Sequence, residues 1–410
     1  MAEGGTSSPS FRRFWFGQAA SQLGDAFGLV AMPQLVLETT HSVTGMGTVT
    51  AVAAVGQVIA TPFAGVIVDR VHRRRLMIGC DLARLALYAS LPLCAWSGTL
   101  KLGLIYVVAL LTSVASNLFM VGYVAAIANL VESSEVARAN GRLQATQALT
   151  YVVGSALGGA ACARFGNAGA MGIDALSFAA SATTLSLVRF RRDRAERATD
   201  VALNPLRELL QGFSFLTHER SLRAQTLFQT GVALLGSVGV SAAVIDVLIY
   251  RLKVDFHQSS SIVGTSLALS SVGAVVGAVA GGKLSKRVRF GVLCIAGTTL
   301  QGVGMLLGGF GANAVFTIVG GLFWSCGLTT RAVAGVSLRQ TLTPDALLGR
   351  VVAVGWLVIF SASAAGAVLV TRLAAAAGSA RAMACLGAAL FAFSLAGAAV
   401  PALRQAGRAP

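Results

Sequence analysis

Asp25 is the residue of this sequence that is best placed to do chemistry. It lies about eleven residues, or ~16 Å of helix, into an apolar run that begins near Phe14. An ionised carboxylate in apolar surroundings is costly unless it faces water or a partner, so a functional role is the first hypothesis for it. The chemistry open to such a group is the binding and release of a proton. A structural carboxylate bonded to a neighbouring helix is the alternative.

Gln18 and Gln22 precede Asp25 at helical spacing, so the three side chains share one face of a helix. We expect this face to line a cavity in which a small molecule is bound. Further polar and aromatic side chains inside apolar runs are candidates for the same cavity, although hydrogen bonds between helices alone would also explain them. These candidates are Asn117, Gln147, Tyr151, Phe178, Trp324 and Trp356.

Asp81 and Arg84 are a second set of charges inside an apolar run, at i, i+3 spacing. That spacing lets the carboxylate and the guanidinium pair, which lowers the cost of placing either among apolar groups. We expect a structural or gating role for this pair rather than contact with a substrate. Asp174 and Asp246 lie nearer the ends of their runs, so we expect them to be structural or solvated. Arg331 is close enough to a basic end of its run to extend to water.

Nothing in the sequence predicts a metal, a cofactor or an enzyme active site. The four histidines are scattered in polar segments without metal-ligand spacing, and the six cysteines lie inside apolar runs, where they are typical of reduced packing residues. No GxxxxGK[ST] motif occurs, so an ATP-driven pump is also excluded.

The elements that must position these residues are long apolar runs. Of the 410 residues, 55% are hydrophobic and 12% are charged, whereas a soluble domain carries about 25% charged residues. The apolar runs are roughly 20 residues long, the length that crosses a hydrocarbon core of ~30 Å as a helix. The short alternation typical of lipid-facing strands is missing from the sequence. We therefore predict an all-α integral membrane protein.

We predict twelve membrane spans. The charged segment 190–221, which contains Pro205, separates them into an N-terminal six-helix bundle over 1–189 and a C-terminal six-helix bundle over 222–410, and we expect this segment to be a cytoplasmic linker. The predicted spans are 14–37, 45–68, 76–96, 102–123, 142–163, 168–188, 222–249, 258–282, 290–310, 312–334, 349–371 and 380–402.

The basic residues predict the orientation of the chain in the membrane. If the N-terminus is cytoplasmic, six of the 32 Lys and Arg residues fall outside and one within a span, which leaves 25 at cytoplasmic ends and loops. The positive-inside rule therefore predicts that both termini are cytoplasmic, in a bacterial plasma or inner membrane. The net charge of +16 does not predict nucleic-acid binding, because the basic residues lie at the ends of apolar runs and not on one soluble face.

The two halves of the chain repeat the same loop chemistry. The second span ends in "GVIVDRVHRRR" and the eighth in "GKLSKRVRF", 217 residues later. The fifth span opens with Gly141-Arg142 and the eleventh with Gly349-Arg350, 208 residues later. Two parallel six-span repeats indicate a pseudo-symmetric transporter, with its substrate site near the midplane between the halves.

The block Gly65-x-x-x-Asp69-Arg70-x-x-Arg73-Arg74 resembles the cytoplasmic loop signature of the major facilitator superfamily. The stretches "FWFGQAASQLGDAFGLVAMPQLVL", "DLARLALYASLP", "IDALSFAASA" and "LRQTLTPDALLGRV" are similar to the twelve-span exporter branch that includes macrolide efflux permeases and enterobactin-type siderophore exporters. The resemblance covers nearly the whole chain. It implies secondary active transport, with proton-driven export of a medium-sized amphipathic compound. Two features depart from the family: Ser155 replaces the proline of the antiporter signature, and the fourth span lacks the arginine signature of many proton-coupled members.

The resemblance also implies a cytoplasmic gate, because the loop acid of the family latches the two halves together on that side. Asp69 would dock at the start of the eleventh span, where we expect Thr343 to be the N-cap and Pro344 the first helical residue, or on Arg350. A helix N-terminus attracts an anion. The residues that we assign to this gate are Gly65, Asp69, Arg70, Arg73, Arg74, Asp81, Arg84 and Arg350.

Two functions stay open at this point. The first is proton-coupled export of a drug, an antibiotic or a siderophore-like compound, with Asp25 as the proton-coupling residue and multidrug resistance as a consequence. The second is an uptake symporter for a nutrient or metabolite. The deep parts of the spans are mostly Ala, Val, Leu and Gly with one midplane acid, which favours an apolar or cationic substrate over an anionic one. We expect the chain to act as a monomer whose partners are this small molecule, protons and the lipid bilayer.

Overall fold

The computed structural model describes residues 8–132, 135–188, 205–236 and 243–407, and every regular element in these ranges is a helix. Eight of the described helices are long and apolar enough to cross a membrane. The chain is a multi-pass membrane protein, as the composition predicts. Contacts group it into two compact units, residues 1–35 with 56–205 and residues 36–55 with 206–410, which we call unit 1 and unit 2.

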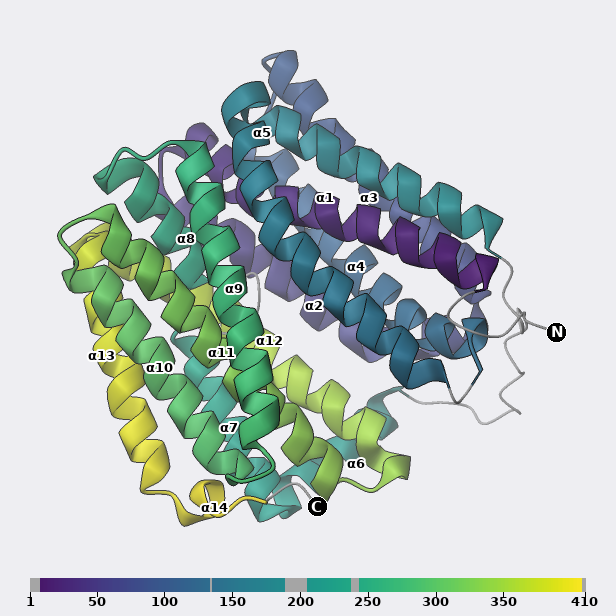
Figure 1. Ribbon diagram of the computed structural model, residues 1–410, viewed down its shortest axis with the longest axis vertical. Coiled ribbons are helices and arrows are strands. Elements are labelled where there is room, and N and C mark those ends of the chain that lie inside the picture. The colour runs from purple at the N-terminus through teal and green to yellow at the C-terminus, as the bar shows by residue number, and fades with distance from the viewer. Residues whose placement is uncertain (1–7, 133–134, 189–204, 237–242, 408–410) are drawn as a thin grey trace. The chain divides into compact units, whose positions relative to one another are not determined.

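Unit 1 consists of long helices (Figure 1), of which α3 packs against both α4 and α5. Its α1 and α2 continue into unit 2 at residues 36–55. The helices are α1 (Pro9–Thr40), α2 (Val43–Arg70), α3 (Arg73–Trp96), α4 (Leu102–Leu130) and α5 (Val136–Leu187).

In unit 2 the helices α9, α10, α11 and α13 pack side by side, and α12 packs against α7 (Figure 1). The elements are α6 (Pro205–His218), α7 (Arg220–Leu234), α8 (Ala243–Tyr250), the π-helical turn η2 (Arg251–Asp255), α9 (Ser260–Leu284), α10 (Phe290–Phe310), α11 (Ala314–Leu342), α12 (Asp345–Ala377), α13 (Ser379–Ala398) and α14 (Pro401–Arg404).

Two glycines make equivalent turns in the two halves of the sequence. Gly166 interrupts α5 with φ 74° and ψ 167°, at the boundary between the predicted fifth and sixth spans. Gly378 separates α12 from α13 with φ 86° and ψ 152°, 212 residues later. This backbone region is open essentially to glycine alone. The internal repeat found in the loops therefore extends to the turns that reverse the chain between spans.

The predicted seventh span is not one continuous helix, and the prediction of 222–249 as a single element is wrong. α7 ends at Leu234, and Gly236 has φ 68°, which a right-handed helix does not allow. The next described helix, α8, begins at Ala243. Apolar composition continues through this region, so periodicity alone did not indicate the break. Discontinuous helices in transporters expose backbone groups that can bind a solute or an ion.

Candidate functional site

Four charged side chains gather in unit 1, from three helices. Asp25 comes from α1, Asp81 and Arg84 from α3, and Asp174 from α5. Asp81, Arg84 and Asp174 are 0%, 4% and 1% exposed, whereas Asp25 is partly exposed. Asp25 is within electrostatic range of Asp81 and Arg84, and Asp174 is within range of Asp25 and Arg84. We call these four residues the charge cluster.

Arg84 is held on three sides. Its guanidinium donates a hydrogen bond to Asp81 Oδ1, so the ion pair predicted from the i, i+3 spacing is present. Its Cζ atom also lies 4.5 Å from the ring centroid of Phe119 and 4.3 Å from that of Phe178. A cation over aromatic faces is stabilised by their quadrupoles, more strongly when water is excluded. Phe178 has no exposed surface, so its described contacts are with the protein interior.

Asp174 is part of the cluster and is not solvated, which corrects one of the two expectations for it. Its carboxylate oxygens face α1 at Gly24 and Gly28, where a Cβ atom would lie 2.8 and 2.3 Å from them. Asp25 lies between these two glycines in sequence, so both carboxyl groups approach the same turn of α1. Three carboxyl groups share one guanidinium among the described side chains of the cluster. A proton on one carboxyl group would reduce this excess of negative charge.

The predicted polar face of α1 is directed into unit 1. Gln18 is buried and its Nε2 donates to Ser181 Oγ of α5 at 3.3 Å. Gln22 has a buried Oε1 with no hydrogen-bond partner among the described residues. Tyr151 of α5 is half-buried and lies within electrostatic range of Asp25. The sequence-predicted group of Gln18, Gln22, Asp25 and Tyr151 is therefore gathered on the α1 and α5 helices.

Asn117 makes the hydrogen bonds between helices that were the alternative to a role in a substrate cavity. Its Nδ2 donates to Gln57 Oε1 at 2.7 Å and to Thr61 Oγ1 at 3.3 Å, both on α2. These are hydrogen bonds between helices of unit 1. Gln147 is half-buried, and its backbone oxygen accepts from Thr150 Oγ1 at 2.9 Å.

The arginine block between α2 and α3 is divided between exposed and anchored side chains. Gly65 and Arg70 are exposed, and Arg73 is partly buried. Arg74 Nε donates to the backbone oxygen of Leu185 at 3.1 Å, which fixes the start of α3 to the end of α5. The side chain of Asp69 lies outside the described residues.

Arg350 in unit 2 binds α6, a helix inside the predicted linker segment 190–221. Its Nη1 donates to Gln211 Oε1 at 2.7 Å, and its Nη2 lies 3.7 Å from Glu208 Oε1, both on α6. The expected cap near it is wrong by one residue: Thr343 is the C-cap of α11, and α12 begins at Asp345 with Pro344 as the N-cap. Pro344 has ψ 143°, outside the helical region, so it precedes the helix instead of starting it.

One acidic and one basic side chain of unit 2 are more buried than expected. Asp246 is 3% exposed and accepts a hydrogen bond from Thr50 Oγ1 at 2.6 Å, so it is structural and not solvated. Arg331 is also buried, and its Nε donates to Gln301 Oε1 at 3.2 Å instead of extending to water. Both side chains find polar partners on neighbouring helices, which sequence reasoning on one helix at a time cannot show.

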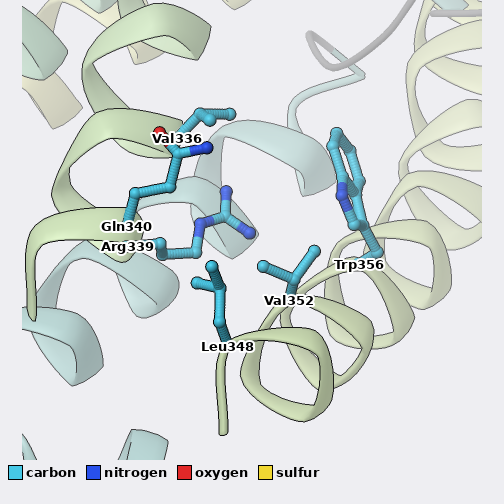
Figure 2. A pocket seen from close by; sticks show the side chains of 6 residues that line it. All are labelled: Val336, Arg339, Gln340, Leu348, Val352 and Trp356. Carbon is cyan, nitrogen blue, oxygen red and sulfur yellow. The ribbon is translucent and has the colours of Figure 1, made fainter. Parts of the chain in front are cut away.

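A cavity of about 200 Å³ lies in unit 2 between α11 and α12 (Figure 2). Arg339 directs its guanidinium into it, opposite the indole of Trp356. Trp356, a predicted cavity residue, is half-buried and stacks on Phe360 with ring centroids 5.2 Å apart. Trp324, another predicted cavity residue, is buried on α11 and does not line this cavity. Sequence reasoning missed Arg339, because a basic residue near the end of a span is ordinarily a topology signal.

Long apolar helices that bury charged and amide side chains are typical of polytopic membrane transporters. A family model described as Major Facilitator Superfamily matches residues 14–367. The chain belongs to this superfamily, which confirms the resemblance found in its loops and spans.

Curated relatives with sequence similarity include exporters. The chain is 27% identical over 360 residues to the enterobactin exporter EntS of Citrobacter koseri, a match that covers 84% of this chain and 80% of that one. The enterobactin exporter EntS of Escherichia coli O1:K1 gives the same identity and the same coverage.

Solved structures with lower sequence identity share the fold. A variant of the nucleoside transporter NupG superposes with a TM-score of 0.80 at 9% identity, over 95% of this chain and 98% of that chain. An inward-facing bacterial homologue of the human lysosomal transporter Spinster gives a TM-score of 0.73 at 12% identity, over 96% and 95% of the two chains.

Proposed function

We propose that this protein is a proton-coupled exporter of an amphipathic small molecule and works by alternating access. The observation that carries the proposal is the charge cluster, in which Asp81 pairs with Arg84 while Asp25 and Asp174 lie within electrostatic range of it inside one unit. The similarity to enterobactin exporters over 84% of the chain supports export, and supports a drug, antibiotic or siderophore-like compound as the substrate.

In the proposed membrane arrangement the chain crosses the bilayer twelve times and has both termini in the cytoplasm. The eight helices that satisfy the length and composition of a span support this arrangement, together with the turn at Gly166 that makes α5 two spans. The remaining crossings are α1, α11 and the pair α7 and α8. The basic residues at the ends of the apolar runs support the orientation. We propose that the protein works as a monomer.

Asp25 is the proposed site of proton binding. It is the member of the cluster that is partly exposed, so a proton can reach it, while Asp81 holds Arg84 nearby. A protonated Asp25 leaves the Asp81–Arg84 pair undisturbed. A deprotonated Asp25 attracts the same guanidinium, and the excess negative charge then favours a second packing of α1 against α3 and α5. Proton binding and release thereby select between two packings of unit 1, which is the coupling that alternating access needs.

The proposed cytoplasmic gate uses Asp69 and Arg350. The family resemblance supports Asp69 as a latch that docks at the start of α12, where backbone N–H groups would donate to its carboxylate. Arg350 already has two partners on α6, so docking of Asp69 there would compete with Glu208 and Gln211. The segment between the halves then contributes to the gate instead of serving as a passive connection.

Everted and right-side-out membrane vesicles test the direction of transport. Fluorescent amphipathic compounds are offered to both preparations, each energised with an inward-acidic or an outward-acidic proton gradient. An exporter accumulates the compound in everted vesicles with an acidic interior, and a protonophore abolishes the accumulation. Accumulation in right-side-out vesicles with an acidic exterior would instead establish uptake by symport, which is the alternative function. A gradient-independent rate in both preparations would rule out proton coupling.

A further inference from the structure

The cavity between α11 and α12 is bordered by a buried arginine that has no acidic partner among the described side chains. Arg339 is 4% exposed. Its Nη2 donates to Gln229 Oε1 of α7 at 3.2 Å, and its Nε donates to the backbone oxygen of Gly335 at 3.3 Å. Both acceptors are neutral. No carboxylate among the described side chains pairs with this guanidinium.

Two of the other buried arginines of the described chain have acidic partners. Arg84 pairs with Asp81, and Arg251 Nη1 lies 3.3 Å from Asp255 Oδ2. Burying a guanidinium is expensive unless an anion and further hydrogen bonds compensate for the lost water. Arg339 has the hydrogen bonds but not the anion, so the arrangement is complete only when an anion from outside the described side chains enters the cavity.

Two glycines leave room for the Arg339 side chain and its partners. A Cβ atom at Gly355 of α12 would lie 2.9 Å from Arg339 Nη1, so a larger residue there would collide with the guanidinium. A Cβ atom at Gly335 would lie 2.4 Å from Gln229 Nε2 and 2.6 Å from Gln225 Nε2. These two glycines let the glutamines of α7 and the arginine of α11 approach one another.

Gln225 supplies a second unsatisfied group beside the arginine. Its Oε1 and Nε2 atoms are buried and have no hydrogen-bond partner among the described residues. Buried amide groups are normally hydrogen-bonded, and each exception in a native structure calls for a reason. Gln225 does not line the cavity, so an anion in the cavity would meet Arg339 and not this amide.

The opposite wall of the cavity is apolar and aromatic. Leu348, Val352 and Trp356 line it from α12, whereas Val336 and Gln340 line the α11 side beside Arg339 (Figure 2). Arg339 Cζ lies 5.8 Å from the Trp356 ring centroid, so the charge and the indole border the same space. Sites for whole drug-sized ligands measure about 300–1,000 Å³, and this cavity of about 200 Å³ is therefore sized for one end of such a molecule.

We infer that this cavity binds the anionic end of the transported compound, a carboxylate or similar oxyanion attached to an aromatic or apolar body. That the bound compound is also transported rests on the proposed function, whereas its binding in the cavity does not. It changes the expectation from sequence, which favoured an apolar or cationic substrate because the deep parts of the spans are mostly apolar with one midplane acid. Arg339 recognises the oxyanion, Gln229 holds the guanidinium in place, and Trp356 contacts the body.

Equilibrium binding of matched probes to the purified, detergent-solubilised full chain tests this inference. The probes are 1-naphthoate, its neutral analogue 1-naphthamide and the cation 1-naphthylmethylammonium, titrated by calorimetry. We expect naphthoate to bind best. Arg339→Gln should weaken the binding of naphthoate at least ten-fold and leave the binding of naphthamide unchanged. Arg339→Lys should retain part of the preference for naphthoate over naphthamide. Trp356→Leu should weaken naphthoate and naphthamide alike.

Matched variants keep the test decisive. Arg331→Gln removes a buried arginine eight residues earlier on the same helix, outside the cavity, and should leave naphthoate binding unchanged; size-exclusion profiles establish that each variant is folded. Equal binding of naphthoate and naphthamide to the native chain would overturn the inference. So would a native chain that binds no naphthoate while Asp345→Asn binds it, because Asp345 would then be the partner of Arg339. Because the titration uses no proton gradient, a failure of proton coupling leaves its outcome unaffected.

Discussion

Arg84 donates a hydrogen bond to Asp81 one helical turn earlier on α3, and both side chains are buried inside unit 1. This pair lowers the free-energy cost of burying charges in an apolar interior, because the attraction between the partners offsets their desolvation. Asp25 and Asp174 add negative charge around the same guanidinium. The pair therefore holds Arg84 in place within electrostatic range of Asp25, the proposed coupling residue.

Removal of one partner of the pair should cost more stability than removal of both. Asp81→Asn leaves Arg84 buried without its carboxylate, and we expect a loss of about 3–5 kcal/mol in the free energy of unfolding. The double variant Asp81→Leu with Arg84→Met should lose less, because neither member of the pair is left buried without the other, and Asp25 and Asp174 can bind protons when the guanidinium is removed. Thermal unfolding of the purified protein, followed by tryptophan fluorescence, compares the variants. A double variant that is less stable than Asp81→Asn would show that the pair does not act through charge compensation.

The spans and the superfamily could be predicted from the sequence because they depend on local composition and loop motifs. Twenty-residue apolar runs must form helices in lipid, whatever their neighbours are. Partnerships between helices could not be predicted in this way. Asp174 looked peripheral by its distance from the end of a span, yet α5 packs its carboxylate against Gly24 and Gly28 of α1.

The cavity of unit 2 was predicted only in part, for a similar reason. Trp356 was a candidate from its residue type. Arg339 was not, because the positive-inside rule accounts for a basic residue near the end of a span without any binding role. The hydrogen bond from Arg339 to Gln229 of α7 shows that the guanidinium of Arg339 is retained inside the protein. The break after Leu234 was missed because an apolar sequence continues on both sides of it.

The turn at Gly166 should not tolerate a side chain. Its φ of 74° and ψ of 167° are open essentially to glycine, so Gly166→Ala should destabilise the protein by about 1–3 kcal/mol. Gly103→Ala is the matched control, since that glycine lies in α4 and an added Cβ atom there meets nothing within 4 Å. Melting temperatures of the two variants measure the difference. Equal temperatures would mean that the backbone at Gly166 relaxes without cost.

The docking of α6 on α12 should depend on a close contact of Gly212. A Cβ atom at Gly212 would lie 2.6 Å from the backbone oxygen of Arg350, so Gly212→Val should displace α6. We expect faster hydrogen exchange of the α6 amides in this variant, measured by mass spectrometry. Gly282→Val introduces the same side chain where nothing lies within 4 Å and should leave exchange in α6 unchanged. Unchanged exchange in both variants would argue against this contact.

The hydrogen bond from Thr50 to Asp246 should stabilise unit 2. Thr50→Val keeps the size of the side chain but leaves the buried carboxylate without its donor, at a cost of about 1–3 kcal/mol. Thr50→Ser keeps the hydroxyl group and should lose less. Thermal unfolding distinguishes the two variants, and equal losses would assign the effect to packing of the methyl group instead.

Transport by Asp25→Asn tests proton coupling most directly, when driven accumulation and substrate exchange are measured in the same vesicles. The amide has the shape of the carboxylic acid but cannot release a proton. We predict that the variant still exchanges a fluorescent substrate across the membrane at equilibrium, and that a proton gradient no longer drives its accumulation. Gradient-driven accumulation by Asp25→Asn at the native rate would contradict the assignment of Asp25 as the coupling residue.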